Sequence, residues 1–315
     1  MNIKKVGLTA LAASLVSVSA YAGEMSVSGG ASIGLKNTSK TSSGKSWTMG
    51  NQLTFSGSGE LDNGMNVALS FILDQDDDTT QTESKREENS PFDSHSVTIS
   101  SDALGSLKFT GEGASSAQSA IDTTAAGDAW DNGSSIDSPK SSESGNNSML
   151  YTLPTIIDDV TLVGSYSPGG AGGPSATAFR IGYTGVEGLS VDYAEGQIET
   201  VGSEADVTTM KASYAYSSFT LSASNTEYDA ASGDETVTSY NVAYTVSDDL
   251  SIAYGTETIE TQGSATDEEA EKFNVSYTTG GVTVSATQYN FDNQGNVTTA
   301  AGESGRWALS ATFAF

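Results

Sequence analysis

Residues 307–315, the last nine of the chain, read WALSATFAF. Large apolar side chains stand at Trp307, Leu309, Phe313 and Phe315, and smaller residues stand between them. Neighbouring side chains of a β-strand point to opposite faces, so this stretch has one broad apolar face and one face of small residues. It therefore predicts a strand that meets an apolar environment on one side only.

The same alternation runs through most of the chain. Residues 65–73 read MNVALSFIL and residues 240–246 read YNVAYTV, with apolar residues at every second position. Val, Tyr, Phe and Thr favour strands, and no long 3.6-residue period follows residue 22. The pattern predicts about sixteen strands, at residues 24–36, 46–60, 64–74, 92–102, 105–112, 147–153, 157–166, 175–184, 189–197, 205–216, 219–228, 235–245, 250–260, 268–278, 281–290 and 302–315.

The connections between these strands alternate between tight turns and long polar loops. Tight turns are expected at residues 62–64, 154–156 and 247–249, among others, and several carry the Gly, Asn or Asp that hairpins select. Such alternation is typical of an all-β, antiparallel up-and-down barrel that spans an outer membrane, with both chain ends on the short-turn rim. The long loops are expected at residues 37–45, 75–91, 113–146, 167–174, 198–204, 229–234, 261–267 and 291–301.

Charged residues test this interpretation, because a Lys or Arg in the middle of a lipid-facing surface costs about 2–4 kcal/mol. With the apolar set of each strand taken as outward-facing, charges such as Asp206, Glu227 and Glu260 fall only toward the long-loop ends. An apolar content of 36% then fits a barrel that needs apolar residues on its outer face alone. The opposite, inward-facing set contains Lys108, Arg180, Asp192, Lys211, Lys272 and Arg306.

The N-terminus has the features of a secretory signal. Two lysines precede an apolar stretch of small residues from 6 to 20, and an A-x-A cleavage site ends at Ala22. We expect a signal peptide at residues 1–22, cleaved near Ala22, and one barrel domain at residues 23–315. Cleavage removes two basic residues and changes the net charge from -27 to -29.

Composition excludes several other classes of protein. The chain has no Cys, which removes disulfide scaffolds, thiolate zinc sites and Cys nucleophiles. The single histidine, His95, leaves no multi-His metal site and little room for a catalytic triad, so we expect no enzyme and no cofactor. A net charge of -27 argues against nucleic-acid binding. After the signal, no apolar run approaches the ~20 residues of a transmembrane helix.

The signal, the sixteen-strand layout and the terminal Phe315 resemble the general porins of Gram-negative outer membranes. The resemblance covers essentially the whole mature chain, and its most specific element is the C-terminal strand. It implies recognition of that strand by the outer-membrane insertion machinery, a homotrimer, contact with outer-membrane lipid and lipopolysaccharide, and a third loop that folds into the barrel. Carried over, residues 113–146 are this constriction loop, with a short helical piece at residues 114–121. General porins place a dense arginine cluster opposite the loop, and this chain has only three Arg.

Acidic residues dominate the expected constriction loop. Carboxylates in a narrow pore concentrate cations and exclude anions. The alternative is a solvated external loop, with the inward charges of the wall paired locally. The residues expected to line the pore or its constriction are Lys108, Glu112, Asp122, Asp128, Asp131, Asp137, Arg180, Lys211 and Arg306.

A second acidic stretch has the spacing of hard-cation ligands. Asp74, Asp76 and Asp78 follow a D-x-D-x-D pattern but lack the Gly and distal Glu of an EF-hand. A solvated loop is the simpler interpretation, and weak Ca²⁺ or Mg²⁺ binding, bridging to lipopolysaccharide phosphates, is the alternative. We assign no metal site.

The sequence thus favours a passive outer-membrane channel for ions and small hydrophilic solutes, with a preference for cations. A substrate-specific channel on the same barrel would place aromatic residues along the lumen, whereas most aromatics here fall on the outward set. A secreted β-rich adhesin or surface-layer protein would show a fixed internal repeat. A barrel enzyme would need a catalytic constellation that the sequence lacks.

Overall fold

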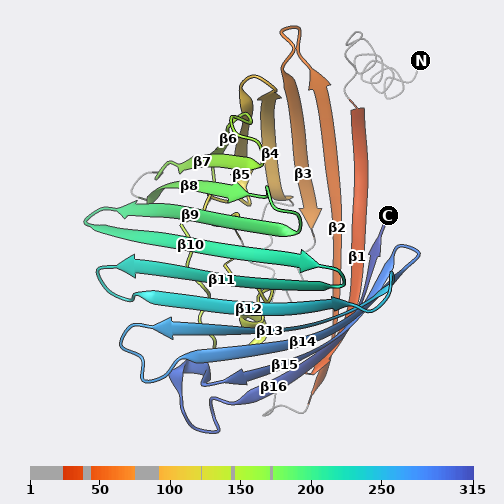
Figure 1. Cartoon of the computed structure of the whole chain (residues 1–315), viewed down its shortest axis with the longest axis vertical. Helices are drawn as coiled ribbons and strands as arrows, with labels where there is room; N and C mark the ends of the chain where they lie inside the picture. Colours follow the sequence, from red (N-terminus) through yellow and green to blue (C-terminus); the bar gives the residue numbers. More distant parts are fainter. Residues whose placement is uncertain (1–23, 38–43, 75–91, 122, 143–145, 171–172) are drawn as a thin grey trace, which may run out of the picture.

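Sixteen antiparallel strands form one closed barrel in the computed structural model, which describes residues 24–37, 44–74, 92–121, 123–142, 146–170 and 173–315 (Figure 1). Each strand pairs with its neighbours in sequence, and the first pairs with the last. The predicted all-β class and strand number are confirmed. The predicted signal peptide lies outside the described residues.

The strands differ little from their predicted positions. They are β1 (Glu24–Asn37), β2 (Lys45–Glu60), β3 (Asn66–Asp74), β4 (Phe92–Ser101), β5 (Gly105–Glu112), β6 (Ser148–Thr152), β7 (Val160–Ser167), β8 (Ser175–Tyr183), β9 (Leu189–Thr200), β10 (Ser203–Tyr216), β11 (Phe219–Ala230), β12 (Glu235–Thr245), β13 (Leu250–Thr261), β14 (Glu268–Thr279), β15 (Val282–Asp292) and β16 (Ser304–Ala314). Among the described connections, two contain short 3₁₀ turns, η2 (Trp130–Asn132) and η3 (Gln294–Asn296).

The barrel closes where the C-terminal strand meets β1. Gly29 and Phe315 exchange two backbone hydrogen bonds, of 2.8 and 3.0 Å, and the pairing continues from Gly30 opposite Ala314 to Lys36 opposite Ala308. A Cβ atom at Gly29 would lie 2.6 Å from the ring of Phe315, so a larger residue here would require that ring to move. Closure satisfies the strand edges that lipid cannot hydrogen-bond.

Two connections differ from the prediction. Strands β9 and β10 are joined by Val201 and Gly202 alone, not by a loop at residues 198–204. Polar residues there keep the strands paired up to Thr200 opposite Ser203, and Gly202, with a φ of 83°, makes the tight turn. Between β6 and β7 the turn predicted at residues 154–156 instead extends over residues 153–159. The first disagreement arises because paired polar strand ends resemble loops in composition.

The two faces of the wall differ as expected from the alternation. Tyr240 is 58% exposed on the outer face, whereas Ser239 beside it is fully buried on the inner face. Outward-facing apolar residues such as Met210 and Leu221 are also about half exposed. No helix among the described residues is long and apolar enough to cross a membrane. In Figure 1, β1–β4 run steeply, whereas β7–β15 run across the view.

The buried residues lie mainly between the inner wall and the loop that follows β5. Ala129 of this loop packs with Ala270, Tyr289 and Phe291 of the wall in a small apolar cluster. Ile136, also in the loop, packs against the same cluster. The barrel therefore has its apolar core on one side of its interior, under the loop.

A charge introduced on the lipid-facing side of the wall is expected to lower stability more than a charge introduced on the lumen-facing side. Replacing Leu221 by Arg places a cation toward lipid and is expected to lower the free energy of unfolding in lipid vesicles by about 2–4 kcal/mol. The matched variant Ser222→Arg faces the lumen and is expected to lose about 1 kcal/mol, from its hydrogen bond to Ser213. Equal losses in denaturant titrations of the two variants would contradict the assigned faces.

Candidate functional site

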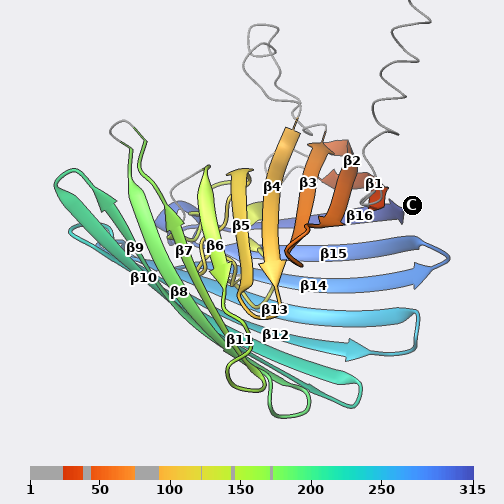
Figure 2. The same ribbon diagram turned by 90° about the horizontal axis from the view of Figure 1, so that it is seen from above.

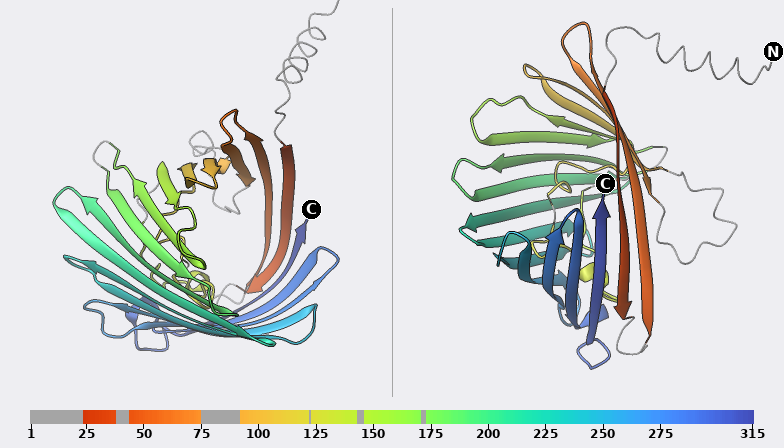
Figure 3. Two further views of the ribbon diagram at one scale, coloured as in Figure 1. Left: turned by 45° about the horizontal axis from the view of Figure 1, so that its top comes forward. Right: turned by 90° about the vertical axis from the view of Figure 1, so that its right-hand side faces the viewer.

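The loop between β5 and β6 lies inside the barrel (Figures 2 and 3), and hydrogen bonds join it to the inner face of the wall along most of its described length. Near its start, the Ala117 N–H donates to Ser165 Oγ of β7 at 2.8 Å, and Gln118 Nε2 donates to Thr209 Oγ1 of β10 at 2.8 Å. The helical piece expected at residues 114–121 is a single turn, closed by Ala120 N–H on the Ser116 carbonyl. Side-chain anchors on the wall replace helical hydrogen bonds here.

Three buried wall glutamates accept hydrogen bonds from the backbone of the loop. The two carboxylate oxygens of Glu257 accept from the N–H groups of Ala129 and Trp130, both at 2.9 Å. Glu268 accepts from the Asp137 N–H at 2.8 Å. These hydrogen bonds are charge-assisted because their acceptors are carboxylates. They offset the hydration that each carboxylate loses when it is buried.

The third of these glutamates also holds a cation. Glu235 accepts from the Lys140 N–H at 2.9 Å and forms an ion pair of 2.6 Å with Lys140 Nζ. The Lys140 ammonium additionally lies 5.5 Å from the ring centre of Tyr228. The loop's one basic side chain among the described residues is thus turned to the wall.

Three wall cations bind the carbonyl groups of the same loop. Lys211 Nζ donates to the Thr124 carbonyl at 2.9 Å, and Lys272 Nζ donates to the Gly127 carbonyl at 2.8 Å. Arg306 Nη1 donates to the Asn132 carbonyl at 2.9 Å. The wall glutamates therefore hold loop N–H groups, and the wall cations hold loop C=O groups.

The predicted acidic residues of the loop have different environments. Asp128, Asp131 and Asp137 are all exposed. The Asp128 carboxylate accepts from Thr124 Oγ1 at 3.0 Å and Trp130 Nε1 at 3.2 Å, and so holds the local backbone turn, whereas Asp137 is fixed through its N–H. The predicted residue Asp122 lies outside the described residues.

The remaining predicted wall residues are not among the described residues that hydrogen-bond to the loop. Lys108 is exposed on β5 and pairs in register with Thr98. Glu112 ends the same strand opposite His95. Arg180 forms an ion pair with Asp192, with a distance of 2.7 Å between Nη2 and Oδ1. Lys211 and Arg306 are thus the two predicted basic residues that the fold brings to the loop.

Sequence reasoning missed the three wall glutamates. Strand alternation does place Glu235, Glu257 and Glu268 on the inner face. However, nothing in the sequence shows which inner positions the loop will cover, because that depends on the path of the loop across strands distant in sequence. One signal was available in the sequence. Gly255, which precedes Glu257 on the same inner face, leaves room for the loop beside an inward-facing carboxylate.

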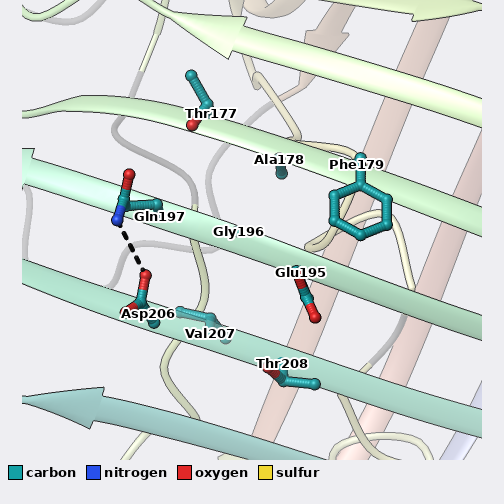
Figure 4. Close-up of a pocket in the computed structure, with 9 residues that line it drawn as sticks. All are labelled: Thr177, Ala178, Phe179, Glu195, Gly196, Gln197, Asp206, Val207 and Thr208. Atoms are coloured by element: carbon teal, nitrogen blue, oxygen red, sulfur yellow. Dashed lines mark hydrogen bonds between the residues drawn. The ribbon is translucent and has the colours of Figure 1, made fainter.

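A hollow of about 650 Å³ lies on the wall at β8–β10 (Figure 4). The outward-facing residues that border it include Phe179, Glu195 and Asp206, and Gln197 Nε2 donates to Asp206 Oδ1 at 3.2 Å. Asp206 stands toward the long-loop end of the outer face, as the sequence predicts, whereas Glu195 lies near the middle of β9. The hollow is therefore at the outer surface and separate from the loop.

The second acidic stretch gives no metal site in the described part of the chain. Asp74 ends β3 and is exposed, whereas Asp76 and Asp78 lie outside the described residues. No group of three or more metal-ligating side chains with the required proximity occurs among the described residues.

A closed barrel with an apolar outer face, a polar inner face and a loop across its interior is a membrane-spanning channel fold. A family model described as Gram-negative porin matches residues 7–297. The chain belongs to the Gram-negative porin family. It is therefore a multi-pass protein of the outer membrane and a channel for small solutes. Among curated proteins, none matches the chain.

Solved structures share this fold at low sequence identity. A porin refined at 1.8 Å resolution has a TM-score of 0.69 and 16% identity, over 93% of this chain and 100% of that one. An anion-selective porin from Comamonas acidovorans has a TM-score of 0.66 and 15% identity, with the same coverage. The trimer form of OmpT, an outer membrane protein of Vibrio cholerae, has a TM-score of 0.62 and 14% identity, again over 93% and 100%.

Glu257 predicts a test of the loop attachment. In a Glu257→Ala variant the N–H groups of Ala129 and Trp130 lose their acceptor, and the free energy of unfolding is expected to fall by about 1–3 kcal/mol. The freed loop is expected to produce rapid current fluctuations in single-channel recordings. Glu257→Gln keeps one carbonyl acceptor and is expected to show a smaller effect. Quiet, unchanged currents in the alanine variant would contradict the attachment.

Proposed function

We propose that this chain is a passive diffusion porin whose loop, residues 113–146, narrows the lumen and gives it a preference for cations. The single observation that carries the proposal is the set of hydrogen bonds between this loop and the inner face of β7–β16. A loop held there leaves the free passage between itself and the remaining wall. Its exposed carboxylates then border the path of every solute.

The charge balance around the loop supports the cation preference. Three exposed loop aspartates and three wall glutamates stand against Lys140 and three wall cations, so carboxylates are in excess. The wall cations direct their N–H groups to loop carbonyls, and the partial negative charge of those carbonyls offsets part of each positive charge. The lumen next to Asp131 and Asp137 is expected to attract small cations.

The fold does not determine the sign of selectivity, since the Comamonas acidovorans neighbour is named as anion-selective. The sign must follow from the side chains of each chain. The arginine cluster of general porins has no counterpart among the described wall residues, where Arg180 is paired with Asp192 and Arg306 contacts the loop. This departure favours cations in the present chain.

A substrate-specific channel on the same barrel is less well supported. Inward-facing aromatic residues would have to form a track along the lumen. Tyr289 and Phe291 are instead buried in the apolar cluster under the loop, and Tyr228 lies beside Lys140. Membership of the Gram-negative porin family, a family of channels, supports the further proposal that this chain has no enzymatic activity.

Assembly and partners form a further part of the proposal. The trimer form of a structural neighbour supports a homotrimer for this chain. Recognition of the C-terminal strand by the insertion machinery fits the position of Phe315, which is 75% exposed at the closing strand. Contact with lipopolysaccharide fits the acidic, long-loop end of the outer face, through bridging divalent cations. Residues 1–22 would direct export and be cleaved near Ala22 before the barrel enters the outer membrane.

Planar bilayer recordings test the channel function directly. The purified protein is expected to give stepwise conductance, and a KCl gradient is expected to give a reversal potential of the sign that marks K⁺ as the more permeant ion. Absence of conductance steps would overturn the channel proposal. An anion-selective reversal potential would overturn the role of the loop carboxylates while leaving the fold intact.

The loop aspartates predict a graded loss of selectivity. Replacing Asp131 and Asp137 by Asn removes two exposed charges at the loop, and each is expected to lower the K⁺ over Cl⁻ permeability ratio about twofold. Asp248→Asn removes one charge from a tight turn between β12 and β13 and is the matched control, with no expected change. Equal reversal potentials for the double variant and the parent would refute the assignment of these residues.

A further inference from the structure

A row of serines crosses the inner wall at one level of the barrel. In the strand register, Ser26 of β1 lies opposite Ser56 of β2, Ser56 opposite Ser70 of β3, and Ser70 opposite Ser96 of β4. Ser96 in turn lies opposite Thr110 of β5. The four serines alternate with outward-facing apolar residues, which places them toward the lumen. We refer to Ser26, Ser56, Ser70 and Ser96 as the serine row.

The hydroxyl groups of the serine row have no partner in the described part of the protein. None of the four hydroxyl groups donates a hydrogen bond to another described residue or accepts one from it, and all four serines are at least partly exposed. Serines on the opposite wall differ, because Ser165 and Ser239 accept hydrogen bonds from the loop backbone. The serine row is therefore free to bond to water or to a solute in the lumen.

The surface around the row is hollowed and almost uncharged. The serine row, together with Ser58 and Thr98, borders a hollow of about 250 Å³. Among the described inward-facing residues of β1–β5, Lys108 is the one charged residue more than two positions from a strand end. Beyond Thr110 the row continues to Ser148 of β6, which is 5% exposed and whose Oγ has no hydrogen-bond partner among the described residues.

The two sides of the lumen are thus chemically unlike. The loop side, on β7–β16, contains the wall glutamates, the wall cations and the exposed loop aspartates. The side of β1–β5 presents hydroxyl groups and few charges. A solute that passes between them meets ionic groups on one side and neutral hydrogen-bonding groups on the other.

We propose that the serine row determines which neutral solutes this channel passes, and that it favours small polyhydroxylated molecules such as sugars. A sugar that enters a narrow lumen loses hydrogen bonds to water, and this loss slows its passage unless the wall replaces them. Each serine hydroxyl both donates and accepts, so the row can replace those bonds without selecting one orientation of the solute. The proposal rests on the channel function above and adds the class of neutral solute to it.

The test compares sugar permeation with ion conduction in one set of variants. In the triple variant Ser56→Ala, Ser70→Ala and Ser96→Ala, the row loses three hydroxyl groups and the lumen widens slightly. We expect arabinose and glucose to enter proteoliposomes about fivefold more slowly, which is the rate equivalent of one net hydrogen bond. The K⁺ over Cl⁻ permeability ratio in planar bilayers is expected to stay unchanged, because the loop carboxylates remain.

A second triple variant separates hydrogen bonding from pore width. Ser56→Thr, Ser70→Thr and Ser96→Thr keep the hydroxyl groups and add methyl groups, so the lumen narrows. The proposal expects sugar rates close to those of the parent. Sieving by width alone would make the threonine variant the slowest and the alanine variant the fastest, and that order would overturn the proposal.

The control removes three inward-facing hydroxyls elsewhere. Ser213, Ser222 and Ser276 bond to other wall hydroxyls, and their replacement by Ala is expected to leave sugar entry unchanged. Equal slowing in the control and the row variant would overturn the proposal, as would a parallel fall of K⁺ conductance and sugar entry in the row variant. Absence of all conductance in the parent protein would instead refute the channel function. Heat-modifiable migration in detergent gels confirms that each variant folds.

Discussion

The structure depends on one constraint, which is that lipid cannot hydrogen-bond a peptide group. Every strand of a membrane-spanning sheet must find partners on both edges, and the sheet must close. In this chain the closing contact is the exchange of backbone hydrogen bonds between Gly29 and Phe315. Closure fixes which residues face lipid and which face the interior, and hence where charge is tolerated. The interior that results is mainly polar, and its apolar cluster lies where the loop covers Ala270, Tyr289 and Phe291 of the wall.

The loop after β5 uses this polar interior as a docking surface. Its N–H groups are directed to Glu235, Glu257 and Glu268, and its C=O groups to basic residues of the wall. Such bonds hold an irregular backbone in a defined position, which a loop exposed to solvent on all sides would not have. The same bonds engage three basic residues of the wall, Lys211, Lys272 and Arg306, so the carboxylates of the loop remain prominent charges of the lumen. Selectivity in this account is a consequence of how the loop is attached.

The sequence predicted the strands well, because alternation is a local signal that closure does not alter. Residues 307–315 are one example, and the outward set that contains Leu221 is another. It failed at residues 198–204, where polar strand ends stay paired as far as Thr200 and Ser203. It also placed Lys211 and Arg306 on the inner face but could not assign their carbonyl partners. Those contacts join residues about 90 to 170 positions apart, and strand alternation contains no information about them.

The loop is fixed against the inner wall, and the absence of Cys makes a direct measurement of this attachment possible. The Ala126 N–H lies 3.0 Å from Ser239 Oγ of β12, so thiols introduced at these two positions would lie near each other in the folded barrel. The measurement is the free thiol content of the Ala126→Cys, Ser239→Cys variant after mild oxidation, together with its single-channel conductance. With the loop fixed in this way, complete loss of free thiols is expected in the folded barrel, with conductance unchanged. Thiols that stay free, or a conductance that changes when the disulfide forms, would contradict this attachment.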